Sequence, residues 1–279
     1  MFYLLLTPLL YAYSSLGARH VQRLGLNVYS VGAFNYVFSA LAYAILYMLQ
    51  PEPLAPQVLY GGVVLGVLFA VTYIFFVPTL FDRGVSVMAA LCQLSALVPM
   101  AGSLLIWHEQ PTPVRWTGAV LCLVAMPMLA LDKGITDDSR LSWRRMFIFT
   151  GLVAFNGGVL LALKWFQELG VPRQFDGFML TTFCTATVVM AVCWPLYRGV
   201  LSRPVVVWGA AISIAYIGAA MMIVQALRFY EGVVVFPFAE ATAVALTVAF
   251  AALVWKEIPG RLGLAGIGVV TVAAVLINL

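Results

Sequence analysis

A single carboxylate stands in the middle of a long apolar stretch. Glu240 lies in the segment V-V-V-F-P-F-A-E-A-T-A, about seven residues, or roughly 10 Å along a helix, from the end of its apolar run. Burying a charge among apolar groups is costly unless the charge is paired, hydrated or neutralised by a proton. Glu240 therefore predicts either a site that exchanges a proton or holds a cation, or a structural carboxylate bonded to a neighbouring helix. Pro237, three residues earlier, is expected to bend that helix.

Polar and aromatic side chains occur in several other apolar runs. A hydrogen bond between helices contributes only about 0.6 kcal/mol in a membrane interior, so each of these groups alone has a structural explanation. As a set they predict a cavity with aromatic and hydroxyl walls and little fixed charge. The candidate substrate-binding or coupling residues are Glu240, Tyr13, Ser14, Tyr36, Tyr73, Gln93, Asn156, Thr182 and Tyr216, and the same runs also hold Tyr11, Ser15 and Thr72.

The sequence offers no arrangement for catalysis or for holding a metal. His20 and His108 lie at the ends of apolar runs, and the four cysteines lie inside runs without a Cys-x-x-Cys pair. There is no glycine-rich phosphate loop and no Ser–His–acid set. We therefore expect a protein that is not an enzyme, has no cofactor or metal and does not bind nucleic acid. The net charge of +4 fits basic loops that face lipid head groups.

Membrane-spanning helices must position these residues. The chain of 279 residues is 63% hydrophobic and 9% charged, whereas soluble domains have about 25% charged residues. A helix needs about 20 mostly apolar residues to cross a bilayer, and continuous apolar blocks favour helices over the alternating strands of a barrel. The predicted fold is an all-α polytopic membrane protein with ten transmembrane helices. The apolar runs are residues 2–18, 28–49, 58–80, 85–107, 114–131, 146–165, 177–197, 205–227, 233–255 and 262–279.

The chain contains an internal repeat. The segment I-W-H-E-Q-P at 106–111 returns as V-W-K-E-I-P at 254–259, so that Trp107 and Trp255 are 148 positions apart. At the same offset Gly61, Gly84 and Gly118 fall on Gly209, Gly232 and Gly266. Upstream, V-Q-R-L-G-L at 21–26 resembles F-Q-E-L-G-V at 166–171 at an offset of 145. One small gap joins the two alignments.

The repeat predicts two halves of five helices. Because five is odd, the second half enters the membrane from the opposite side, which makes an inverted-topology repeat with a site near the midplane. The first repeat is expected at 1–132 and the second at 146–279. The charged segment 133–145 is the candidate link between them.

The end of each half resembles the drug/metabolite transporter superfamily, and in particular its EamA-type ten-helix family. The residues that carry the resemblance are W-H-E109 and W-K-E257, then Pro111 or Pro259, then a short helix with Gly118 or Gly266. In that family a fourth helix ends in Gly-Glu and a fifth begins a few residues on. Here His108 and Lys256 replace the glycine.

The resemblance implies a secondary active transporter that works by alternating access. Its substrate would be a small amphipathic metabolite, such as an amino acid or a related compound, and protons are a candidate coupling ion through Glu240. Two alternatives stay open: a flippase for lipids or lipid-linked substrates, and a non-transporting membrane subunit or scaffold. The expected partners are a small-molecule substrate and membrane lipids, and the protein would be a monomer or a homodimer.

The distribution of basic residues predicts the orientation. The loops after the odd-numbered runs hold eleven Lys and Arg residues, whereas the other loops and the termini hold four: Arg115, Lys164, Arg173 and Arg228. Basic residues favour the cytoplasmic side. We therefore expect both termini outside, in a bacterial-type inner (plasma) membrane, although members of the resembling family usually have both termini in the cytoplasm.

The repeated W-x-E-x-P segment is expected to be structural. Lysine replaces the histidine in the second copy, which argues against a catalytic His–Glu pair. We expect Trp107 at the membrane interface, Glu109 in water and Pro111 where the next helix begins. Arg19 and Lys164, which match at the 145 offset, are expected to be interface anchors that reach toward water.

Overall fold

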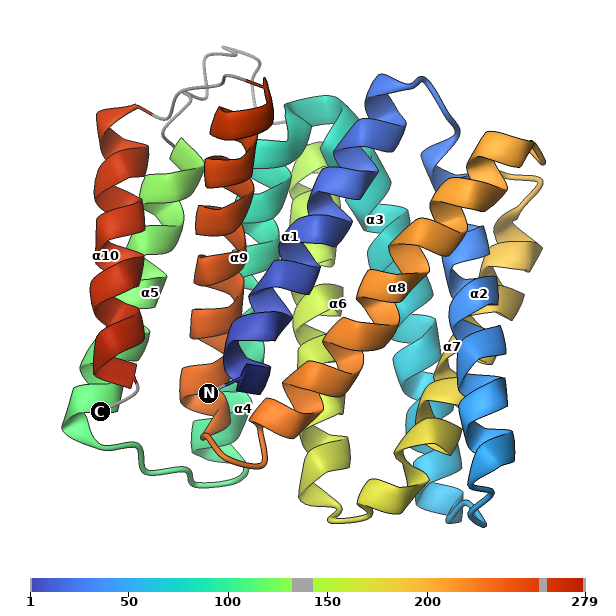
Figure 1. Cartoon of the computed structure of the whole chain (residues 1–279), viewed down its shortest axis with the longest axis horizontal. Coiled ribbons are helices and arrows are strands. Elements are labelled where there is room, and N and C mark those ends of the chain that lie inside the picture. The colour runs from blue at the N-terminus through green and yellow to red at the C-terminus, as the bar shows by residue number, and fades with distance from the viewer. Residues whose placement is uncertain (1, 132–142, 256–259, 278–279) are drawn as a thin grey trace.

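The computed structural model describes residues 2–131, 143–255 and 260–277, and these residues form helices and short connections with no β-strand. Ten α-helices stand side by side in a bundle (Figure 1). Their bounds are α1 Phe2–Arg23, α2 Val28–Leu49, α3 Pro56–Leu94, α4 Leu97–Leu105, α5 Pro113–Leu131, α6 Trp143–Glu168, α7 Phe175–Cys193, α8 Arg203–Ala226, α9 Gly232–Trp255 and α10 Arg261–Ile277, with a 3₁₀ turn η1 at Pro172–Gln174.

The helices follow the predicted runs except at the third and fourth. Separate helices were expected at 58–80 and 85–107, but α3 is continuous to Leu94 and the interruption falls at Ser95 and Ala96. Pro99 explains that position, because a proline has no N–H to donate to the carbonyl four residues earlier and its ring crowds that carbonyl. At the expected linker, α6 already begins at Trp143, while 133–142 lies outside the described residues.

Five described helices are long and apolar enough to cross a bilayer, as in a multi-pass membrane protein. They are Val28–Leu49, Pro56–Phe81, Met146–Glu168, Pro172–Cys193 and Arg203–Ala226. Shorter apolar helical stretches occur at Pro113–Ala125, Gly232–Thr247 and Arg261–Ala273. In the part of the chain that the structure describes, the spans expected at 2–18, 85–107, 114–131, 233–255 and 262–279 are not among these five.

The most extensive helix contacts join the first five helices to the last five. Helix α1 packs on α8 and α9, α2 on α7 and α8, α3 on α6 and α7, and α5 on α10. When each helix is exchanged with its counterpart five places along the chain, most of these contacts map onto one another: α3 with α6 becomes α8 with α1, and α1 with α9 becomes α6 with α4. The contact of α5 with α9 is an exception, because α10 and α4 make no contact of similar extent among the described residues. In Figure 1 counterpart helices run in opposite directions, for example α2 and α7 or α5 and α10.

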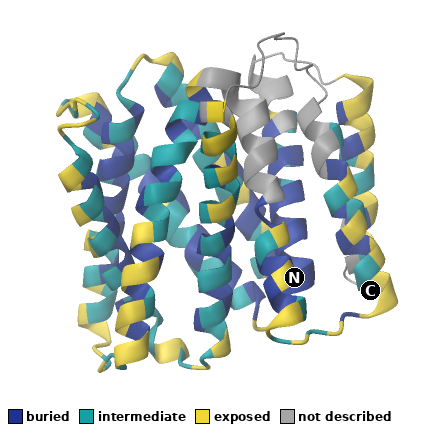
Figure 2. Ribbon diagram, turned by 180° about the vertical axis from the view of Figure 1, so that it is seen from behind, coloured by how far each residue is buried: buried dark blue, intermediate teal, exposed yellow. Residues whose placement is uncertain are grey.

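Glycines allow the closest helix approaches. A Cβ atom on Gly66 of α3 would clash with the backbone oxygen of Thr182 in α7, and one on Gly209 of α8 would lie 3.2 Å from the backbone nitrogen of Asn35 in α2. Figure 2 shows the result, with buried residues on the faces where helices meet and exposed residues on the outer faces. Small residues at such crossings are typical of helix packing in membranes.

Both termini lie toward the lower end of the bundle in Figure 1, which we call the termini end. The connections α2–α3, α4–α5, α6–α7 and α8–α9 lie at the same end. This end contains the charged residues described below.

Candidate functional site

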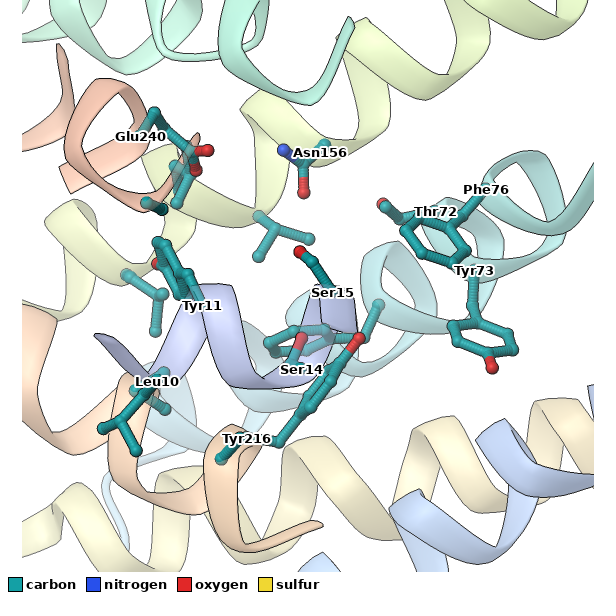
Figure 3. A pocket seen from close by; sticks show the side chains of 18 of the residues that line it. Leu10, Tyr11, Ser14, Ser15, Thr72, Tyr73, Phe76, Asn156, Tyr216 and Glu240 are labelled. Atoms are coloured by element: carbon teal, nitrogen blue, oxygen red, sulfur yellow. The ribbon is translucent and has the colours of Figure 1, made fainter. Parts of the chain in front are cut away.

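A cavity of about 150 Å³ lies in the middle of the bundle, between both halves of the chain. Its walls come from the central parts of α1, α2, α3, α6, α8 and α9 (Figure 3). Most of its surface is apolar, with hydroxyl groups from Ser14, Ser15, Thr72 and Thr247. A cavity of this size in another protein holds a benzene ring, so the space suits a small molecule.

Glu240 reaches the cavity from α9. It lies eight residues, or about 12 Å, beyond Gly232 at the start of that helix, and Pro237 lies between the two. The side chain is 9% exposed, and no described basic residue forms an ion pair with it. Figure 3 shows its carboxylate beside Tyr11 of α1 and facing Asn156 of α6.

Five aromatic residues form the opposite side of the cavity; we call them the aromatic wall. They are Tyr36, Phe69, Tyr73, Phe76 and Tyr216. The ring centroid of Tyr36 lies 6.0 Å from that of Tyr73 and 6.1 Å from that of Tyr216, in edge-to-face contact. Such pairs hold each other in a defined orientation.

The hydroxyls of two wall tyrosines are already used in helix packing. Tyr36 donates to the carbonyl of Phe69 at 2.9 Å, and Tyr73 donates to the carbonyl of Val28 at 2.9 Å. Gly32 makes room for the second contact, because a Cβ there would clash with the Tyr73 ring. Tyr36 and Tyr73 therefore offer the cavity their rings and not their hydroxyls.

Asn156 connects the cavity to the interruption between α3 and α4. Its amide Nδ2 donates to Ser95 Oγ at 2.5 Å. Ser95 is fully buried in the turn that Pro99 produces. The break in the helix is thus held by a side chain from the other half of the chain, directly at the cavity.

The cavity brings together six of the nine predicted site residues. Ser14, Tyr36, Tyr73, Asn156, Tyr216 and Glu240 all line it. Tyr13 does not, because its side chain is 46% exposed on the outer face of α1. Thr182 does not either, since it is buried against α3 and donates to the carbonyl of Phe178 at 2.8 Å. The side chain of Gln93 lies outside the described residues.

Residues outside the predicted nine also line the cavity. Tyr11 and Ser15 do so together with Ser14. Their spacing of three and four residues places them on one helix face, so this pattern was available from the sequence. Phe69 and Phe76 carried no such signal, because an aromatic residue in an apolar run is equally suited to lipid.

A second polar cluster lies at the termini end, and we call it the charge cluster. Lys164 Nζ lies 2.6 Å from Glu109 Oε1 and 2.5 Å from Glu168 Oε1, with side-chain exposures of 3%, 11% and 36%. The two oxygens of Glu109 also accept the backbone N–H groups of Gly232 and Val233, at 3.0 and 3.1 Å. These N–H groups begin α9 and have no partner within the helix, and a carboxylate there is favourable.

A further ion pair closes the same end. Arg115 Nη1, at the start of α5, lies 2.9 and 3.1 Å from the two carboxylate oxygens of Glu231, just before α9. Both this pair and the Glu109–Lys164 pair join one half of the chain to the other. Lys164 follows Leu163, which lines the cavity, so along α6 the charge cluster adjoins the cavity lining at the termini end.

These contacts correct two expectations. Glu109 was expected in water, but it is largely buried and caps a helix. Lys164 was expected to reach toward water, but it is 2% exposed and paired with two carboxylates. The backbone at His108 has φ of 51°, the left-handed conformation that favours glycine.

The pKa of Glu109 reflects the same contacts. Burial alone raises the pKa of the carboxyl, but the Lys164 ammonium and the two α9 N–H groups stabilise the charged form and hold the pKa below its usual value. Glu109 is therefore ionised at neutral pH.

Among the described residues no group of three or more His, Cys, Asp or Glu side chains has an arrangement that could hold a metal ion. No family model and no curated protein matches the chain. A solved crystal structure does match, with a TM-score of 0.70, 14% sequence identity and coverage of 98% of each chain. The chain therefore has a fold that is found in an experimental structure, and identity this low shows the fold alone.

Proposed function

We propose that the protein is a secondary transporter that moves a small amphipathic molecule across a membrane by alternating access. The observation that carries the proposal is the cavity itself: a mostly apolar, aromatic-lined space at mid-bundle, with several hydroxyl groups, walls from both halves of the chain and one carboxylate, Glu240. A buried carboxylate in an apolar bundle is costly and points to a functional site, so the cavity favours transport over a scaffold or structural subunit.

The arrangement of the helices supports an inverted repeat. Counterpart helices run in opposite directions, and most of the contacts between the two halves are kept when the halves are exchanged. In transporters built in this way, the site lies near the midplane and one half rocks against the other. The two ion pairs at the termini end support a conformation in which the halves are held together at that end.

Glu240 is the proposed coupling residue. The other titratable groups of the described lining are tyrosines, which are uncharged near neutral pH. Glu240 is therefore the residue in this lining that can release and take up a proton as the cavity changes access. A transporter of this kind takes its energy from the proton gradient or from the gradient of the substrate.

Proteoliposomes test the proposal. Purified protein should take up a bound substrate faster when a pH gradient is imposed, and Glu240→Gln should abolish the effect of the gradient while leaving downhill exchange measurable. Glu52→Gln, which changes an exposed carboxylate far from the cavity, is the matched control. Unchanged pH dependence in Glu240→Gln would exclude the coupling role, and absence of any flux of a molecule that binds the cavity would exclude transport.

A further inference from the structure

The cavity is chemically divided along its length. Figure 3 shows Glu240 and Tyr11 at one end and Tyr73 and Phe76 at the other, with Ser15 between them. One end thus presents a carboxyl group, and the other presents aromatic rings whose hydroxyls, in Tyr36 and Tyr73, are engaged elsewhere. A molecule that fills the space must match both ends at once.

The described lining contains a carboxylate and no Lys, Arg or His. The nearest basic residue along α6, Lys164, is held by Glu109 and Glu168 in the charge cluster. Its ammonium is therefore engaged in the charge cluster, and Lys164 is not among the lining residues. The described part of the cavity offers a carboxylate to a positive group of a ligand and offers no cationic side chain to a negative group.

This imbalance distinguishes amines from amino acids. An amino acid would bring a carboxylate into an apolar space that offers it no cation, and an unpaired buried charge is costly. An amine brings only an ammonium, which pairs with Glu240 and gains further from nearby aromatic faces. Its apolar part is then placed against the aromatic wall.

We propose that the cavity binds small primary monoamines that carry an aromatic or branched apolar group, and that it discriminates against the corresponding amino acids. The volume of about 150 Å³ limits the apolar part to roughly one ring. The proposal rests on the proposed transport function and narrows its substrate class. It assigns Glu240 to the ammonium and the aromatic wall to the apolar group.

A matched pair of probes tests this ligand class. Phenethylamine and phenylalanine differ only in the carboxylate, so their affinities for wild-type protein in lipid nanodiscs can be compared by isothermal titration calorimetry. Phenethylamine should bind at least about 30-fold more tightly, because leaving a charge unpaired in a buried site has an effect of this order. This comparison needs no variant, so it does not depend on how well a mutant folds.

Variants then test which part of the ligand binds at the Glu240 end of the cavity and which part binds at the aromatic wall. Glu240→Gln should weaken phenethylamine binding by at least about 30-fold, and Phe69→Leu should weaken it less, while Glu52→Gln should leave it unchanged. Phenylalanine binding as tightly as phenethylamine, or neither probe binding at millimolar concentration, would overturn the amine assignment and leave transport of another molecule intact. Glu240-dependent binding of phenethylamine without uptake into proteoliposomes would support the ligand class and overturn the transport function.

Discussion

Replacement of Glu109 by glutamine removes one charge from the charge cluster and nearly preserves the shape of the side chain. In the wild type the carboxylate pairs with Lys164 at 2.6 Å and accepts the N–H groups of Gly232 and Val233. Glutamine has one accepting oxygen in place of two, and its NH₂ group is a donor that repels both the ammonium and the N–H donors. The variant therefore loses the ion pair and at least one of the two caps of α9.

The size of the effect follows from burial. Removing one partner of a buried ion pair costs about 3–5 kcal/mol, but Lys164 keeps Glu168 as a second carboxylate partner. Loss of a helix cap adds about 1 kcal/mol, part of which the remaining oxygen retains. Because Lys164 stays paired and one cap is partly kept, we expect a net loss at or below the lower end of the ion-pair range, about 2–3 kcal/mol. Since large domains lose about 2–4 °C per kcal/mol, the unfolding midpoint should fall by roughly 4–12 °C.

The assay is thermal unfolding of the purified protein in detergent, followed by tryptophan fluorescence. Glu52→Gln is the matched control, because the Glu52–Arg173 pair is 3.9 Å long and exposed at 37% and 86%, and such surface pairs contribute about 0–1 kcal/mol. Lys164→Met combined with Glu109→Gln should cost less than the sum of the two single changes, since the residues interact directly. Equal midpoints for Glu109→Gln and Glu52→Gln would refute the reasoning.

Four further outcomes are expected. The pKa of Glu109 is lowered in the folded protein. Its contribution to stability is therefore complete above the ordinary glutamate value of about 4.3 and is lost as the pH falls below that value. The difference in unfolding midpoint between wild type and Glu109→Gln should shrink accordingly as the pH is lowered below about 4.3. Gly66→Ala should destabilise the protein by about 2 kcal/mol or more, because its Cβ would clash with backbone, whereas Gly268→Ala, which has open space around it, should be neutral or stabilising by up to about 1 kcal/mol; thermal unfolding distinguishes the two. Tyr216→Ala should weaken binding of a cavity ligand, measured by calorimetry, and Tyr13→Ala should not, because only Tyr216 lines the cavity. Alkaline phosphatase fused to the C-terminus should be active in bacterial cells if the basic-residue bias sets both termini outside. An inactive phosphatase fusion, together with fluorescence from a separate fusion to a reporter that fluoresces only in the cytoplasm, would show the opposite orientation.

Much of the helical pattern was predictable because membrane-spanning helices consist of continuous apolar runs in the sequence. The bounds of α2 agree with the predicted run, and the charged or Pro/Gly-rich breaks mark most of the connections. The exception at α3 shows that charged residues and glycine do not always mark the end of a helix. Asp82, Arg83 and Gly84 suggested a loop, but the helix continues through them, and the interruption is fixed instead by Pro99.

The site was predictable where a residue type was out of place, as with Glu240. For the tyrosines of α1 hydropathy gave no guide, since both faces of a membrane helix are apolar and hydropathy does not tell cavity from lipid. Only helical spacing separates Tyr11, with Ser14 and Ser15, from Tyr13. The charge cluster was beyond sequence reasoning for a different reason: Glu109, Lys164 and Gly232 lie on three segments that meet only in the folded chain.

The packing of first-half helices mainly on second-half helices has a consequence for biosynthesis. A ribosome releases α1 to α5 before the helices that cover them, because α1 packs on α8 and α9, α2 on α7 and α8, and α5 on α10. The first five helices must therefore wait in the bilayer with their glycine faces and polar groups against lipid or an insertion factor. Contacts so distant in sequence make folding slow, so mutations that weaken early-made helices should lower the yield of inserted protein more than the activity of the molecules that do fold.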